Sequence, residues 1–197
     1  NSRVNKYSGT AAIHALALAG TVTDGSNNAL NGTITLSNGP TATQLQTINN
    51  GTGGTIVVHN RGITLSSTAA VVKEALAGTL QDGNGDGLNG AMTISDGDGT
   101  SIAATVLSAI GGGTSGTVTV SNAITITGDI TEVTNALHTE ISKVTASSAD
   151  VTVTGTTNKA EALTIQGYAT NSGSVVLQGA SGSFTDLEAL HNNSEID

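Results

Sequence analysis

Residues 10–39 read TAAIHALALAGTVTDGSNNALNGTITLSNG, and residues 68–97 read TAAVVKEALAGTLQDGNGDGLNGAMTISDG. The two stretches align without a gap, and 16 of the 30 paired residues are identical. The match resumes after a few inserted residues, because NNGTGGTIVVHN at 49–60 aligns with GGGTSGTVTVSN at 111–122. Self-similarity at an offset of 58 residues (68 − 10) predicts a chain built from stacked repeats.

The repeats also set the expected domain organisation. A third, diverged copy begins near Gly128, and FTDLEAL at 184–190 resembles the start of a fourth. We therefore expect an N-terminal extension over residues 1–9, repeat 1 over 10–67, repeat 2 over 68–128, a diverged repeat 3 over 129–183, and the start of a further unit with a tail over 184–197.

Each copy contains two similar halves of roughly 29 residues, a length typical of repeat architectures. In Thr33–Leu36, residues Ile34 and Leu36 alternate with threonine, which predicts a half-buried strand. The same alternation recurs at residues 117–120, 124–127 and 151–154. Strands are therefore expected at all four places.

Short helices are expected between these strands. Apolar residues recur at helical spacing over residues 69–76 and 130–137, with shorter versions around 45–48 and 107–110. Thr68 and Asp129 suit the N-cap position, and Gly78 suits the position after the C-cap. The fold class predicted is mainly β with short helices, as a repeat stack or β-solenoid-like array of strand–short helix–strand units. The alternative is a pair of tandem β-sandwich domains with helical crossovers.

Composition excludes several classes of partner. Charged residues are 11% of the chain and the net charge is −9, with six Lys and Arg in all. A nucleic-acid or anionic membrane surface requires a basic patch that these residues do not form. The longest apolar stretch, residues 11–19, is far short of the ~20 residues of a membrane helix, so membrane insertion is not expected.

No pattern indicates an enzyme. The chain has three aromatic residues and no cysteine, and its four histidines do not fall in metal-binding or triad spacing. The Gly-rich runs lack the features of a phosphate-binding loop. We therefore expect no catalytic residues and no organic cofactor.

One segment resembles a calcium loop. Asp82, Asn84 and Asp86, followed by Gly87, reproduce the D-x-N-x-D-G opening in which alternate oxygen ligands bind Ca²⁺. The twelfth position is Thr93 in place of the usual bidentate glutamate. The competing interpretation is an Asn/Asp/Gly turn between strands, and it is the favoured one.

Three segments carry a resemblance to a known class of proteins. They are ITITGDITEVTNAL (124–137), ADVTVTG (149–155) and ALTIQGYATNSGSVVLQGASGSFTDLEAL (162–190). They resemble the Thr/Ala/Gly-rich repeats of giant cell-surface and exported proteins of cyanobacteria and other bacteria. In that class a "TSG-V-strand" element, to which residues 114–118 and 171–175 are similar, precedes an "ITGT–apolar helix" element, to which residues 126–130 are similar. The resemblance implies surface architecture or adhesion, with no catalytic residues to carry over.

The leading hypothesis is a structural extracellular protein, a segment of a surface filament, surface layer or giant adhesin, located outside the cell or on its surface. Its expected partner is a further copy or a flanking repeat of the same chain, joined head to tail. The joint is expected where Phe184, Leu187 and Leu190 of one copy meet the Ala11–Leu18 face of the next. The alternatives are a calcium-dependent adhesin or phage-fibre-like binding module and, more distantly, an ice-binding protein with ranks of threonine.

Overall fold

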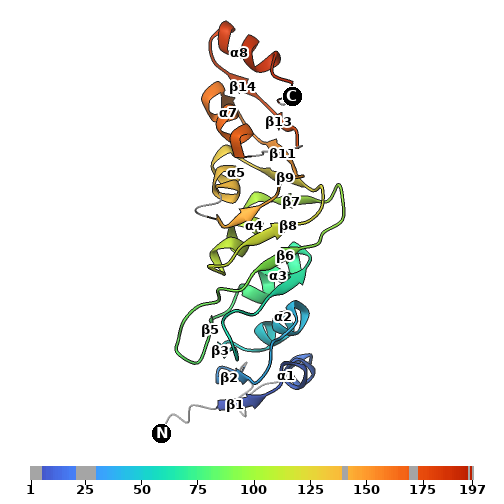
Figure 1. Cartoon of the computed structure of the whole chain (residues 1–197), viewed down its shortest axis with the longest axis vertical. Coiled ribbons are helices and arrows are strands. Elements are labelled where there is room, and N and C mark those ends of the chain that lie inside the picture. The colour runs from blue at the N-terminus through green and yellow to red at the C-terminus, as the bar shows by residue number, and fades with distance from the viewer. Residues whose placement is uncertain (1–5, 21–29, 139–141, 169–172, 195, 197) are drawn as a thin grey trace. The chain divides into compact units, whose positions relative to one another are not determined.

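The computed structural model describes residues 6–20, 30–138, 142–168, 173–194 and 196. The chain forms two compact units. The first comprises residues 1–93 with 113–117, and the second comprises residues 94–112 with 118–197. Figure 1 colours the elements of both in chain order. Residues 1–5 of the expected N-terminal extension, and Glu195 and Asp197 of the tail, lie outside the described residues.

The first unit begins with a parallel sheet. Its elements are β1 (Lys6–Gly9), α1 (Ala11–Leu18), β2 (Thr33–Leu36), α2 (Ala42–Gly51), β3 (Ile56–Val57), β4 (Leu65–Ser67), α3 (Ala69–Leu76) and β5 (Leu80–Gln81), and β6 (Met92–Ile94) follows in the chain. The strands β1, β2, β3 and β5 are neighbours in that order and all pair in parallel. Helix α2 packs against both α1 and α3 (Figure 1).

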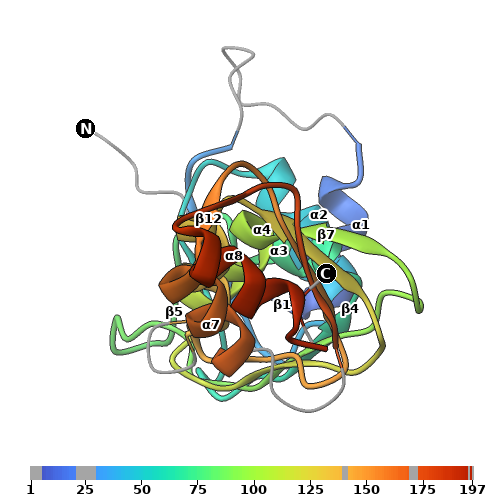
Figure 2. The same ribbon diagram turned by 90° about the horizontal axis from the view of Figure 1, so that it is seen from above.

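The second unit repeats this scheme. Its elements are β7 (Ser101–Ala103), α4 (Ala104–Gly112), β8 (Val118–Val120), β9 (Thr125–Gly128), α5 (Ile130–Leu137), β10 (Val144–Thr145), β11 (Asp150–Val153), β12 (Thr157–Asn158), α7 (Lys159–Tyr168), β13 (Val175–Leu177), β14 (Ala180–Ser181) and α8 (Phe184–His191). Strands β7, β9, β11 and β13 form one parallel sheet, β8 pairs with β10, and β12 pairs with β14. Helix α5 packs against α4 and α7 (Figure 1), and α7 packs against α8 (Figure 2).

The core combines one face of the strands with one stripe of each helix. On β2, Ile34 and Leu36 are buried while the two threonines are half-exposed. On α2, Leu45 and Ile48 are fully buried, and Leu107 and Ile110 of α4 occupy the corresponding positions in the second unit. The alternation and the helical spacing in the sequence thus mark core residues correctly.

The helices are short but well capped. Thr41 and Gln44 at the start of α2, Asp129 and Glu132 at the start of α5, and Ser183 and Asp186 at the start of α8 each form a capping box. In this arrangement the side chain of each residue accepts from the backbone N–H of the other, which satisfies two amides that the helix itself leaves free. The predicted N-cap Asp129 is confirmed. Thr68 also occupies the N-cap position of α3, although its side chain makes no capping bond.

A Thr-x-Gly turn precedes both β3 and β8 and connects each of these strands to an earlier segment of the chain. The Thr52 hydroxyl donates to the Leu30 carbonyl at 2.9 Å and accepts from the Gly54 N–H at 3.0 Å. The Thr114 hydroxyl donates to the Gly90 carbonyl at 2.8 Å and accepts from the Gly116 N–H at 3.0 Å. These bonds reach back 22 and 24 residues. The turn therefore fixes how neighbouring strands align.

The predicted fold class is wrong. The protein is not mainly β: helices account for 36% and strands for 25% of the described residues, and the fold is α/β with parallel sheets. It is accordingly neither the expected β-solenoid-like array nor the alternative, tandem β-sandwich domains, whose sheets are antiparallel. The apolar pattern alone underestimates the helices: the apolar residues at 45 and 48 mark about one turn, whereas α2, which begins after its capping box, has ten residues.

The close contact between α4 and the residues before β10 generates a prediction. A Cβ on Gly111 would overlap the Ser142 carbonyl, whereas a Cβ on Gly112 would meet nothing within 4 Å. We expect Gly111→Ala to lower the free energy of unfolding by about 1–3 kcal/mol, since the backbone must shift to make room. Gly112→Ala, the matched control in the same helix, should leave the free energy of unfolding unchanged or raise it by up to ~1 kcal/mol. Urea unfolding followed by circular dichroism checks both, and equal midpoints for the two variants would contradict the packing described.

Candidate functional site

Large apolar side chains are exposed at a few places, and most of these lie on the first and last described helices. Ile13 and Leu16 of α1 are 65% and 81% exposed, and Phe184 and Leu187 of α8 are 82% and 38% exposed. The others are Leu163 of α7 and Val176 of β13. Helices α2, α3, α4 and α5 carry none. Exposed apolar side chains gathered on particular elements mark candidate interaction surfaces.

The structure separates the residues predicted for the assembly joint. Phe184 and Leu187 lie on the surface, but Ala11, Leu18 and Leu190 are buried within their own units. Sequence reasoning missed Ile13 and Leu16. The available signal was that every residue of AAIHALAL over residues 11–18 except His14 is apolar, so that apolar side chains must remain uncovered on the side of the helix that does not pack against its own unit.

The first candidate surface includes a pocket beside α1, which we call the α1 pocket. Its volume is about 470 Å³, and its lining is largely apolar. The floor comes from β1, β2 and Leu30, and the wall from α1. The lining residues are Lys6, Tyr7, Ser8, Ile13, His14, Ala17, Leu18, Leu30 and Ile34. His14 is buried, with its Nδ1 atom 3.0 Å from the Thr10 carbonyl oxygen, while Lys6 and Ala17 are exposed.

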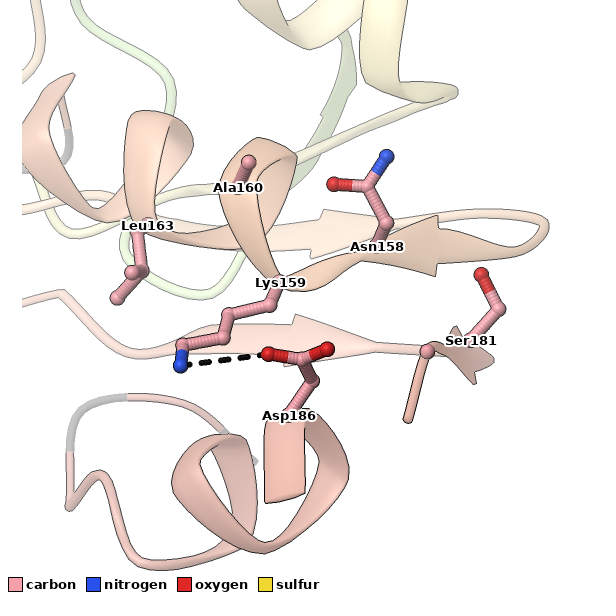
Figure 3. Close-up of a pocket in the computed structure, with 7 residues that line it drawn as sticks. Asn158, Lys159, Ala160, Leu163, Ser181 and Asp186 are labelled. Atoms are coloured by element: carbon pink, nitrogen blue, oxygen red, sulfur yellow. Dashed lines mark ion pairs between the residues drawn. The ribbon is translucent and has the colours of Figure 1, made fainter. Parts of the chain in front are cut away.

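A second hollow lies between α7 and α8 (Figure 3). It is lined by Asn158, Lys159, Ala160, Leu163, Ser181, Gly182 and Asp186. Figure 3 shows Lys159 and Asp186 pointing toward each other across it, with Lys159 Nζ 3.4 Å from Asp186 Oδ1. The Ser183 hydroxyl donates to Asp186 Oδ2 at 2.6 Å and holds the pKa of that carboxyl below its ordinary value, and Lys159 lowers it further. Both charged groups are thus engaged in joining two helices.

The Asp82 segment forms a tight turn. Asp82 Oδ1 accepts from the backbone N–H of Asn84 at 2.8 Å and of Asp86 at 3.0 Å. Gly85 has a φ of +89°, which glycine adopts freely. Asp86 Oδ2 lies 3.2 Å from Arg61 Nη1. Of the two carboxylates predicted to bind calcium, Asp82 therefore has its partners within the turn and Asp86 is paired with Arg61. The part of the chain that the structure describes contains no cluster of three or more His, Cys, Asp or Glu able to hold a metal.

The threonine ranks considered for ice binding are interrupted. In the sheet of β7, β9, β11 and β13, Ala103 lies beside Thr127, Thr127 beside Thr152, and Thr152 beside Val176. Two threonines of this rank are therefore flanked by apolar residues.

The comparisons with known proteins place no constraint on these surfaces. No family model, curated protein or solved structure matches the chain. Among the described residues, no helix has the length and apolar character needed to span a bilayer.

The Asp186 carboxyl makes stability at the α7–α8 hollow depend on pH. A carboxyl whose pKa is lowered on folding stabilises the folded state above its unfolded pKa, which is about 3.8, and loses that effect as the pH falls through the folded value. Asp186→Asn should therefore unfold at a lower temperature than the parent at pH 7, and the difference should shrink as the pH falls below the ordinary aspartate pKa of 3.8. Melting curves of both proteins across this range test the sign. A difference that persists at the acid end would show that the charge is not its source.

The Asp82 turn generates a prediction about calcium. Asp82→Ala removes the acceptor of two backbone N–H groups and should lower the free energy of unfolding by about 1 kcal/mol. Asp86→Ala, which removes an exposed ion pair, should change it by less. We expect the same values in EDTA and in millimolar Ca²⁺. A rise in the melting temperature with Ca²⁺ that the parent shows and Asp82→Ala lacks would instead assign this turn to metal binding.

Proposed function

We propose that the protein is a structural repeat protein of an extracellular or cell-surface assembly, whose copies, or further repeats of the same chain, associate head to tail. The observation that carries the proposal is the exposure of large apolar side chains on α1 and α8. Burying such groups is the main driving force of protein association, and each Leu, Ile or Phe side chain contributes roughly 1.5–3 kcal/mol when fully buried.

The packing within each unit supports the same kind of contact between copies. Helices pack in series along the chain, α1 on α2, α2 on α3, α4 on α5, α5 on α7 and α7 on α8. The paired strands in both units are parallel to one another. A contact between α8 of one copy and α1 of another would therefore have the same form as these internal contacts. Two different surfaces that meet in this way form a heterologous contact, which propagates into a filament unless it closes into a ring.

Sequence composition supports an extracellular setting for the assembly. The chain is acidic and rich in threonine and glycine, and it shows the resemblance to bacterial surface repeats noted above. Two of its few cations, Arg61 and Lys159, already pair with nearby carboxylates.

Self-association of the purified protein tests this function. We expect the weight-average mass to rise with concentration, because each new contact removes Phe184 and Leu187 of one copy, and Ile13 or Leu16 of the next, from water. The double variants Ile13→Asp with Leu16→Asp, and Phe184→Asp with Leu187→Asp, should each remain monomeric. Leu190 is left intact because it is buried and its change would disturb the fold. Sedimentation velocity over a hundredfold range of concentration measures the effect.

A matched control adds the same charge elsewhere. Thr43 and Ala70 are exposed on α2 and α3, so Thr43→Asp with Ala70→Asp raises the net negative charge equally without touching α1 or α8. This control should associate like the parent. The proposal fails if the parent stays a 19.3 kDa monomer at every concentration, or if the control loses association as completely as the end variants.

A further inference from the structure

Phe184 differs from the other aromatic residues of the chain. The sequence has three, and Tyr7 and Tyr168 are each partly covered, whereas Phe184 is 82% exposed. Tyr168 already packs edge-on against His138, with ring centroids 5.3 Å apart. A partner that covers an exposed phenylalanine removes a large apolar area from water. Aromatic side chains of this kind commonly dominate the binding energy of protein interfaces.

The α1 pocket is a suitable receptor for an aromatic ring. Its volume of about 470 Å³ exceeds the ~150 Å³ of an apolar cavity that binds benzene. Ile13, Ala17, Leu18, Leu30 and Ile34 provide apolar walls. Ile13 is itself 65% exposed at the edge of the pocket, so an inserted ring would also cover this side chain.

The charges near Phe184 and near the α1 pocket are complementary. Glu188 is one helical turn from Phe184, on the same face of α8, and is exposed. Lys6 lines the α1 pocket and is exposed. Within the described residues, neither Glu188 nor Lys6 forms an ion pair, whereas Asp186 of α8 is already paired with Lys159. A ring placed in the pocket would bring a carboxylate on α8 toward a lysine on β1.

We infer that Phe184 of one copy inserts into the α1 pocket of a second copy, with Glu188 of the first facing Lys6 of the second. This inference rests on the proposed function and names the residues of its contact. Leu187, one turn from Phe184 on α8, covers Ile13 at the pocket edge. The contact is heterologous, so each copy offers both a ring and a pocket, and the chain of contacts continues.

Disulfide trapping tests the inference directly, because the chain has no cysteine of its own. Lys6→Cys and Glu188→Cys are made as separate proteins and mixed in equal amounts under mild oxidation. We expect the mixed dimer to exceed both homodimers severalfold, because the inserted ring holds the two positions together. Lys73→Cys, at an exposed lysine of α3, replaces Lys6→Cys in the matched control and should give only the statistical proportion of mixed dimer.

The ring itself is tested by Phe184→Ala, a change at an exposed position that circular dichroism should show to be folded. It should weaken self-association at least about tenfold and reduce the trapped Lys6→Cys/Glu188→Cys dimer in proportion. If the parent associates but neither result is obtained, the anchor is wrong and the proposed function stands. If the parent does not associate at all, the proposed function fails as well. A third outcome is that the protein stays monomeric and that a small apolar probe binds the α1 pocket equally well in the parent and in Phe184→Ala. This result would overturn the inference and assign the pocket to a small ligand.

Discussion

The close approach of one backbone to another is the constraint on which the remaining structure depends. At three glycines, the position that a Cβ would occupy is already filled by the backbone of an earlier segment. The filling backbone belongs to Asn31 and Gly32 at Gly54, to Asn89 and Gly90 at Gly116, and to Ala149 at Gly173. Only glycine leaves this space free. Each of these glycines lies just before a segment that pairs in a parallel sheet. The close backbone contact at the glycine therefore fixes the register of the strand that follows. The strands in turn set where the helices pack.

Asparagine side chains also connect the ends of helices to other segments of the chain. Asn49 Nδ2 donates to the Glu74 carbonyl at 2.8 Å, which connects the end of α2 to that of α3. Ala11 N–H donates to Asn38 Oδ1 at 2.8 Å, so a residue 27 positions later caps the start of α1. Such bonds satisfy helix-end groups that would otherwise be buried without partners. They explain why a chain with so few charges retains many asparagines and threonines.

Much of the local structure could be predicted from the sequence, but the balance of helix and strand could not. The strands at 33–36, 118–120 and 125–128 and the helices at 69–76 and 130–137 lie where alternation and helical spacing place them. The fold class was missed because strands of two to four residues carry little pattern, while the helices extend beyond their apolar residues. For the candidate surfaces, Phe184 was found because it is aromatic. Ile13 and Leu16 were missed because His14, a polar residue, takes the buried position on α1.

The short reach of the connecting bonds has a consequence for how the chain folds. The bonds that join neighbouring segments span 22 to 27 residues in both units, as those of Thr52, Thr114, Asn122 and Asn38 illustrate. The entropy lost in closing a loop rises with the logarithm of its length, so every such step meets nearly the same barrier. Duplication of a whole repeat adds further loops of this size and none that is longer. A chain of this design can therefore grow during evolution without slowing the assembly of each added part.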